Sequence, residues 1–260
     1  MIEFFTDAYE LLTEHYEFLL RGVGYTMLIA LVGTIAGLLI GLATGVLRTC
    51  PLSKNGFVSF LQRTLNAVIA AYVEIFRGTP MMVQAMVIYW GYAFATGGET
   101  LPLIPSGILI VSINTGAYMA EIVRGGIISI DKGQFEGAYA VGMTHWQAML
   151  HIILPQVLRN ILPSVANEFV INIKDTSVLN VIGVTELYYF AGIIKKESAM
   201  VFETYLVVCI IYFILTFSVT RLLRLIEKKL QITDSFVICG SQSDPNAEIR
   251  VTKQPEVPHD

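Results

Sequence analysis

The sequence carries little charge for its length. Only 15% of its 260 residues are Asp, Glu, Lys or Arg, whereas 54% are hydrophobic, and soluble domains usually carry about 25% charged residues. The 3 cysteines, Cys50, Cys209 and Cys239, show no C-x-x-C spacing, so we read them as free thiols rather than a disulfide framework or a metal site. The composition predicts an integral membrane protein without a metal site.

Several functional motifs are also missing. No G-x-x-x-x-G-K-[ST] segment occurs, so the sequence offers no phosphate-binding loop for ATP. No H-E-x-x-H segment or nucleophile–base set is evident either, and we predict no catalytic residue. Residues 1–20 contain no Lys or Arg, unlike the start of a cleaved signal peptide.

Five hydrophobic segments are long enough to cross a bilayer, which takes roughly 20 mostly apolar residues. Their approximate limits are 22–47, 64–94, 105–124, 161–184 and 201–223. The second is too long for one unbroken helix, and its Gly-Thr-Pro sequence predicts a break. We therefore expect an all-α integral membrane protein with five transmembrane helices.

The basic residues predict how these helices are oriented. With five spans, one side of the membrane holds most Lys and Arg residues, while the other holds only Arg21, Lys195 and Lys196. Because basic residues concentrate in cytoplasmic loops, we expect the N-terminus outside and the C-terminus in the cytoplasm. Residues 1–20 would then be extracytoplasmic, residues 21–227 the membrane domain, and residues 228–260 a disordered cytoplasmic tail.

The first span has a regular glycine pattern. Gly33, Gly37, Gly41 and Gly45 recur every four residues and therefore share one helix face, where small residues let two helix backbones approach closely. The alternative is that these glycines only make the span flexible.

The stretch between the third and fourth spans is polar and begins in the cytoplasm. Phe135, Ala138 and Val141 follow a helical stripe, Gly142 suits the left-handed residue that often ends a helix, and Thr144 suits the N-cap of a second helix. Two short helices joined at a glycine suit docking into a groove on a soluble partner. A surface-lying amphipathic loop without a partner has the same pattern.

A family resemblance favours the docking interpretation over the loop without a partner. The spacing Glu136-x-Ala138-x-x-x-Gly142, followed by Ile-Leu-Pro, resembles the EAA loop of ABC-importer permeases. Gly137 departs from the pattern, because the family usually has Ala there, and Gly costs about 1 kcal/mol relative to Ala in a helix. FRGTP, GAYMAEIVRGGI, ILPQVLRNILP and NEFVINIKDTSVLNVIGVTEL look like the polar amino-acid permease branch, in that order along residues 20–225.

The resemblance implies the type I ABC-importer permease fold and a membrane subunit for polar amino acids, with basic ones among the candidates. It implies an ABC ATPase dimer that binds ATP and Mg²⁺, a second permease copy or a homologous permease, and an extracytoplasmic solute-binding protein. This chain itself would hold no cofactor and bind no nucleic acid, and it would lie in the plasma membrane of a prokaryote. The coupling loop would be residues 125–152, and the ATPase contacts would be Phe135, Glu136, Ala138, Val141 and Gly142.

Two carboxylates are expected at membrane depth. Glu168 and Asp175 are seven residues apart and therefore lie on nearly the same helix face. Charge at this depth is costly and tends to mark a pathway, so we expect the pair to face the dimer axis and attract a cationic group. A structural ion pair with Arg77 or Lys174 is the alternative. The resemblance adds that acidic residues at these two positions look like part of a translocation-pathway site.

Four other residues are candidates for the walls of the pathway. Met81 and Met82 follow the predicted helix break, and Gln84 and Asn114 are polar residues within spans. Core packing explains the methionines equally well, and hydrogen bonding between helices explains the two amides.

Two other function classes are weighed against the importer. An ion-coupled secondary carrier would use Glu168 or Asp175 as its ion site, but such carriers often contain inverted repeats, which five spans with one docking loop do not provide. An intramembrane enzyme would need a catalytic set, and His145 and His151, six residues apart, do not face each other across helical turns.

Overall fold

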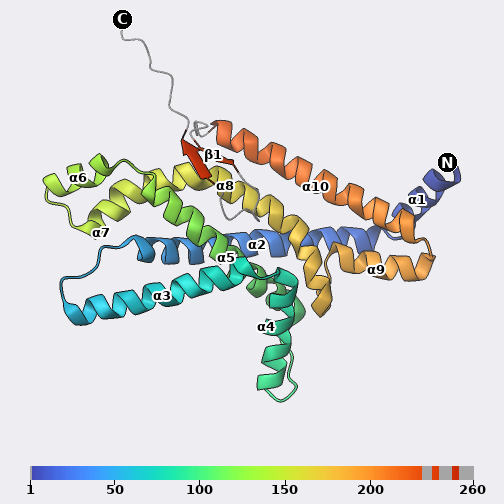
Figure 1. The fold of residues 1–260 in the computed structure, drawn as a ribbon. Helices are drawn as coiled ribbons and strands as arrows, with labels where there is room; N and C mark the ends of the chain where they lie inside the picture. The colour runs from blue at the N-terminus through green and yellow to red at the C-terminus, as the bar shows by residue number, and fades with distance from the viewer. Residues whose placement is uncertain (1, 230–235, 240–247, 252–260) are drawn as a thin grey trace, which may run out of the picture.

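The structure is a computed structural model that describes residues 2–229, 236–239 and 248–251. Most of the described chain is helical and forms an elongated bundle (Figure 1). The α-helices are α1 (Ile2–Glu14), α2 (Tyr16–Thr49), α3 (Gly56–Gly78), α4 (Met81–Ala95), α5 (Leu103–Ile128), α6 (Lys132–Ala140), α7 (His145–Ala148), α8 (Leu154–Asp175), α9 (Leu187–Ser198) and α10 (Val201–Lys229). A π-helical turn, η1 (Met149–Ile153), joins α7 to α8, and a 3₁₀ segment, η2 (Thr176–Ile182), extends α8.

Helices α2 and α5 pack along a shared seam, and the glycine pattern explains why. A β-carbon built at Gly37 would lie 2.8 Å from the Thr115 side chain, and one at Gly45 would lie 2.8 Å from Val123. Gly33 and Gly41 face α5 in the same way. The prediction of close packing is therefore confirmed, because a larger side chain at these positions would have to push the two backbones apart.

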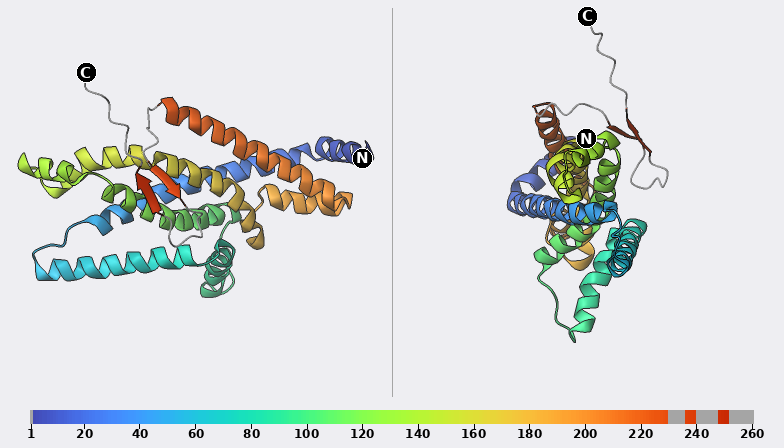
Figure 2. Two further views of the ribbon diagram at one scale, coloured as in Figure 1. Left: turned by 45° about the horizontal axis from the view of Figure 1, so that its top comes forward. Right: turned by 90° about the vertical axis from the view of Figure 1, so that its left-hand side faces the viewer.

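The predicted break in the second hydrophobic segment is also confirmed. Helix α3 ends at Gly78 and α4 begins at Met81, with Pro80 at the N-cap position of α4. Pro80 has a φ of −65° and no backbone N–H, which suits a helix start rather than a helix interior. Helix α4 projects away from the body of the bundle (Figures 1 and 2).

Helices α8, α9 and α10 complete the bundle around α2 and α5. Asn172 of α8 is 3% exposed and donates a hydrogen bond of 2.8 Å to the Thr34 hydroxyl of α2. It also exchanges hydrogen bonds with Thr115 of α5. This buried amide therefore joins three helices at the centre of the bundle.

Within the described part of the chain, four helical segments have the length and apolar composition needed to cross a membrane. They are Tyr16–Thr49, Leu103–Ile128, His145–Ile182 and Val201–Lys229, and Met81–Ala95 is a shorter apolar helix. Large apolar side chains such as Phe213 and Phe217 are exposed on α10, as expected of a helix that faces lipid. The all-helical membrane class predicted from the composition is thus supported.

The tail contains the two short strands in the described residues. Strands β1 (Phe236–Cys239) and β2 (Glu248–Val251) pair antiparallel, with Phe236 opposite Val251. The disorder expected for residues 228–260 stays a prediction. Residues 230–235, 240–247 and 252–260 lie outside the described part of the chain.

Candidate functional site

The predicted coupling segment consists of two capped helices joined by a tight turn. Asp131 caps α6 by accepting a hydrogen bond of 2.6 Å from the Gly133 amide. Gly142 follows α6 with a φ of +83°, a left-handed conformation that suits glycine. Thr144 and Gln147 then form a capping box at the start of α7. The turn at Gly142 and the cap at Thr144 confirm the two signals identified in the sequence.

One side of α6 attaches the segment to the bundle. Ala138 is 2% exposed, and Phe135 packs against the apolar cluster formed by α2, α5, η1 and α8. The Gln156 amide of α8 donates a hydrogen bond of 3.2 Å to the Gln134 side chain of α6. Phe135 and Ala138, which we expected at the ATPase contact, therefore contribute to packing within this chain.

Other residues of the segment are exposed. Val141 is 75% exposed, and Glu136 and Gly142 are exposed as well. Trp146 of α7 and Leu150 of η1 are also exposed apolar side chains of this segment. Exposed aromatic and aliphatic side chains on a firmly held scaffold are typical of protein-binding surfaces. We call these five residues, Glu136, Val141, Gly142, Trp146 and Leu150, the docking surface.

A group of charged and polar side chains lies where α3, α5 and α8 meet. Arg77 lies with its guanidinium carbon 5.6 Å from the ring centroid of Tyr118. The charges of Arg77, Glu168 and Asp175 lie near enough to Tyr118 to act on its hydroxyl. We call these four residues the charged cluster. It contains one cation, two carboxylates and a phenol.

The two carboxylates of the charged cluster differ in accessibility. Glu168 is 6% exposed, so its carboxylate is enclosed by the chain, whereas Asp175 is only partly buried. Among the described residues, no basic nitrogen lies within 4.0 Å of an Asp175 oxygen. Asp175 also marks the point where α8 gives way to the 3₁₀ segment η2. Of the two carboxylates, Asp175 is the more exposed.

Gln84 and Asn114 form a hydrogen-bonded unit at the break between α3 and α4. The Gln84 amide nitrogen donates to the Phe76 and Thr79 carbonyls, each at 2.9 Å, and the Asn114 amide donates to the Gln84 side-chain oxygen at 2.9 Å. These bonds satisfy carbonyls that the break leaves without helical partners. The structure therefore supports the interhelical hydrogen bonding considered for both residues.

The two methionines after the break occupy different environments. Met81 is partly buried and packs against the apolar cluster that includes Ala85 and Tyr89 of α4. Met82 is 49% exposed. Met81 therefore has a packing role within the chain, and Met82 remains available to a wall or an interface.

An ion network lies at the end of the bundle near the coupling segment. The Glu121 carboxylate of α5 bonds to Arg48 of α2 and, at 2.7 Å, to Arg124. The network ties the end of α2 to the end of α5. Within the described residues, no group of three or more His, Cys, Asp or Glu side chains is arranged to hold a metal ion.

Tyr118 of the charged cluster escaped the sequence analysis. It lies within a quoted motif, but nothing in its spacing shows that α3 and α8 approach it. Trp146 and Leu150 have the four-residue spacing of one helix face within the predicted docking segment, but they were not among the expected ATPase contacts. The sequence did not show which face would point outward.

Known proteins are similar in sequence to this chain along most of its length. Residues 56–232 match the family described as the binding-protein-dependent transport system inner membrane component. The glutamine transport system permease protein GlnP of Escherichia coli (strain K12) is 35% identical over 214 residues, covering 82% of this chain and 93% of GlnP. The L-cystine transport system permease protein TcyB of Bacillus subtilis (strain 168) is 35% identical over 210 residues, covering 80% and 85%.

Solved structures agree with the sequence comparison. The crystal structure of an amino acid ABC transporter with histidines is 32% identical and matches with a TM-score of 0.71, covering 84% of this chain and 96% of that chain. The inward-facing MetNI methionine ABC transporter matches with a TM-score of 0.61 at 20% identity, covering 82% and 98%, and supports the fold alone. This chain belongs to the family of inner-membrane components of binding-protein-dependent transport systems.

Proposed function

We propose that the chain is the permease subunit of an ATP-driven importer of polar amino acids and forms half of its translocation pathway. The docking surface carries this proposal: a capped, exposed pair of helices at one end of the bundle, far from α1 and α9 (Figure 1). Family membership supports the same conclusion, as do relatives named as glutamine and L-cystine permeases.

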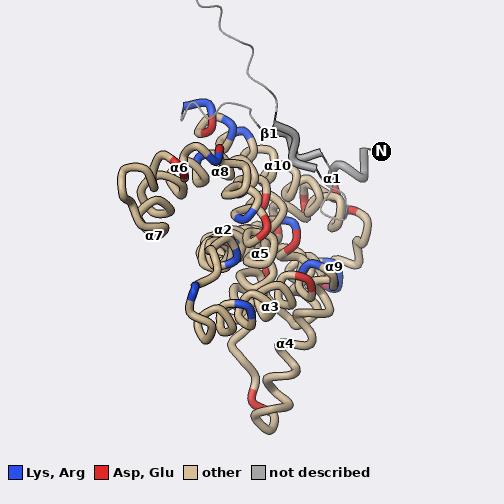
Figure 3. The backbone as a smooth tube through the Cα atoms, turned by 60° about the vertical axis from the view of Figure 1, so that its left-hand side comes forward, with Lys and Arg blue, Asp and Glu red and all other residues tan. Residues whose placement is uncertain are grey.

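The proposed topology has five crossings, with α3 and α4 together forming the broken second crossing. The N-terminus lies outside and the C-terminus lies in the cytoplasm of a prokaryotic cell. Lys and Arg residues gather at the end of α10 (Figure 3), and basic residues favour the cytoplasmic side. This orientation places the docking surface in the cytoplasm.

The proposed assembly contains subunits that supply what this chain lacks. An ABC ATPase dimer binds ATP and Mg²⁺ and receives the docking surface. A second permease copy or a homologous permease completes the pathway, and an extracytoplasmic binding protein delivers the amino acid. The exposed apolar residues of the docking surface suit burial in a groove on the ATPase.

The packing of α6 offers a route from the ATPase to the pathway. Phe135 attaches α6 to the same cluster that holds the start of α8, and Ala138 of α6 is buried as well. Closure of the ATPase dimer on ATP would therefore shift α8 together with α6. Asp175 lies at the far end of α8, so this movement would alter the charged cluster.

The charged cluster suits an amino acid chemically. A carboxylate such as Asp175 attracts an α-ammonium or a basic side chain, and the guanidinium of Arg77 can bind a carboxylate. Hydrogen bonds to charged groups contribute about 1.5–3 kcal/mol, and every 1.4 kcal/mol is tenfold in affinity. We therefore expect Asp175→Asn to lower the uptake of a basic amino acid about tenfold.

Reconstitution tests the proposal. Proteoliposomes containing this chain, its ATPase and its binding protein should take up L-glutamine or L-arginine only with Mg-ATP. Asp175→Asn should impair uptake, whereas Glu99→Gln, an exposed carboxylate in the α4–α5 loop, should not. Uptake by this chain alone, driven by a proton or ion gradient, would show instead an ion-coupled secondary carrier.

A further inference from the structure

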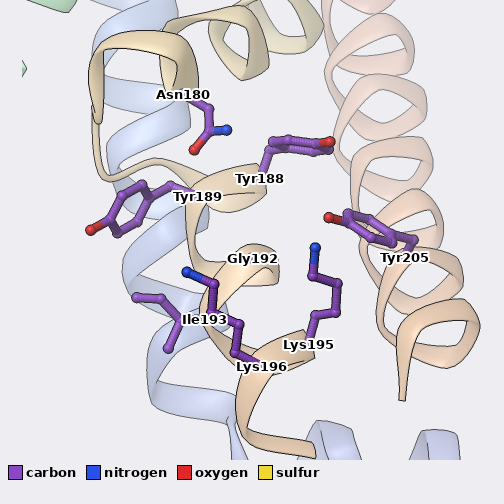
Figure 4. Close-up of a pocket in the computed structure, with 8 residues that line it drawn as sticks. All are labelled: Asn180, Tyr188, Tyr189, Gly192, Ile193, Lys195, Lys196 and Tyr205. Carbon is purple, nitrogen blue, oxygen red and sulfur yellow. The ribbon is translucent and has the colours of Figure 1, made fainter. Parts of the chain in front are cut away.

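A cavity of about 340 Å³ lies between η2, α9 and α10 (Figure 4). Asn180 of η2, Tyr188 and Lys195 of α9, and Tyr205 of α10 line it. Helix α9 lies at the end of the bundle near α1, opposite α6 and α7 (Figure 1). In the proposed topology, this is the end at which an amino acid arrives.

The cavity carries positive charge that no carboxylate of the described residues pairs with. Lys195 and Lys196 both line it, and no carboxylate of the described residues lies within 4.0 Å of either ammonium group. The adjacent Glu197 lies 3.8 Å from His15 instead. The Lys195 nitrogen lies 5.7 Å from the Tyr205 ring centroid, close enough for a cation–π interaction.

Neutral hydrogen-bond donors surround these charges. The rings of Tyr188 and Tyr205 lie 5.6 Å apart, and the Lys195 nitrogen points toward the space between them in Figure 4. The neighbouring Tyr205 raises the pKa of Tyr188, and a phenol is already protonated at neutral pH. Asn180 adds an amide. Ammonium, phenol and amide groups are the donors that a carboxylate accepts from.

A buried carboxylate fixes the walls of the cavity. Glu186 is fully buried and caps α9 by accepting a hydrogen bond of 2.8 Å from the Tyr189 amide. Its second oxygen accepts a bond of 2.7 Å from the Tyr212 hydroxyl of α10. Helices α9 and α10 are thereby joined beside the cavity, which holds Tyr188, Lys195 and Tyr205 in place.

We propose that this cavity binds the carboxylate group of the imported amino acid before the solute reaches the charged cluster. This inference rests on the proposed function, which supplies the class of ligand, an amino acid. The volume exceeds what a single carboxylate needs and falls within the range of small-molecule sites, about 300–1,000 Å³. The tyrosine walls leave apolar surface for the rest of the amino acid.

The experiment measures binding to the assembled permease–ATPase complex without its binding protein, in nanodiscs of neutral phosphatidylcholine. Radiolabelled L-glutamine and L-arginine serve as probes, and the methyl esters of both test the need for a free carboxylate. We expect the Lys195→Gln/Lys196→Gln double variant to bind at least tenfold more weakly, and the Lys195→Arg/Lys196→Arg variant to retain binding. Lys54→Gln removes one positive charge from the α2–α3 loop and should bind as wild type does.

Three results would overturn the inference. The double variant could bind both probes as wild type does, the methyl esters could compete as well as the free amino acids, or wild type could import a probe yet show no binding. Two other outcomes would assign the lysines to a different ligand. If the double variant weakens only the affinity for the binding protein, the lysines bind a protein carboxylate. If it has an effect only in nanodiscs with anionic lipid, they bind a lipid phosphate. Unchanged ATP hydrolysis by the double variant verifies that its complex assembles. A failure of wild-type uptake in proteoliposomes would count against the proposed function itself.

Discussion

The α2–α5 seam and the coupling segment use their surfaces in opposite ways. At the seam, glycines remove every side chain from one face of α2, and α5 fills the space. In the coupling segment, Ala138 and Phe135 hold α6 to the bundle while Val141 remains 75% exposed. The seam is a surface whose partner lies within the chain, whereas the coupling segment presents a surface that still needs a partner. Substitutions should therefore damage folding at the seam and assembly at the docking surface.

The largest effect is expected at the seam. Gly41→Leu would place a side chain against Met119 and Ala120 of α5, and overpacking of this kind costs about 1–3 kcal/mol or more. We expect a lower thermal unfolding temperature and a loss of monodisperse protein in fluorescence-detected size-exclusion chromatography. Gly24→Leu is the matched control, because nothing lies within 4 Å of its added β-carbon on the same helix. Equal damage from both changes would contradict a special role for the seam.

The second prediction concerns the docking surface. Trp146→Ala removes an exposed aromatic residue, and such residues at the centre of an interface often contribute 2 kcal/mol or more to binding, about a thirtyfold change in affinity. We expect weaker assembly with the ATPase, measured by co-purification and ATP-driven uptake, with little change in the stability of the permease. Tyr9→Ala removes an exposed aromatic residue from α1 and should leave assembly intact. If Trp146→Ala assembles normally, Trp146 does not belong to the interface.

Replacing each of two glycines in the coupling segment by alanine should change the stability of α6 in opposite directions. Gly142 has a φ of +83°, and a left-handed conformation costs a residue with a β-carbon about 1–2 kcal/mol, so Gly142→Ala should loosen α6. Gly137 is helical with open space around it, and Gly137→Ala should stabilise α6 by up to about 1 kcal/mol. Hydrogen–deuterium exchange of residues 132–147 measures both effects. Faster exchange in Gly137→Ala, or slower exchange in Gly142→Ala, would contradict this assignment.

Local features of the chain were predictable because they depend on neighbouring residues. The four-residue glycine period indicated the face of α2 that meets another helix, and Pro80 indicated where the second hydrophobic segment breaks. Gly142 and Thr144 marked the turn and the cap in the coupling segment. Each rests on backbone geometry that the residue type itself restricts.

Features that depend on contacts between distant elements were not predictable from spacing. The resemblance implied that Phe135 and Ala138 contact the ATPase, which stays a prediction; their helical stripe alone did not show that Ala138 is buried and Phe135 half-buried against the chain itself. Likewise, Glu168 and Asp175 share a helix face but differ in burial, since α8 ends beside Asp175. The cavity around Lys195 escaped notice because three separate elements build it.

A photo-cross-link from the docking surface tests the central claim most directly. We would place p-benzoylphenylalanine at position 141, or at position 94 of α4 as a control whose side chain is also largely exposed, in the assembled transporter. The account predicts a covalent product with the ATPase subunit from position 141 and none from position 94. A fully active transporter in which position 141 yields no product with the ATPase would contradict it.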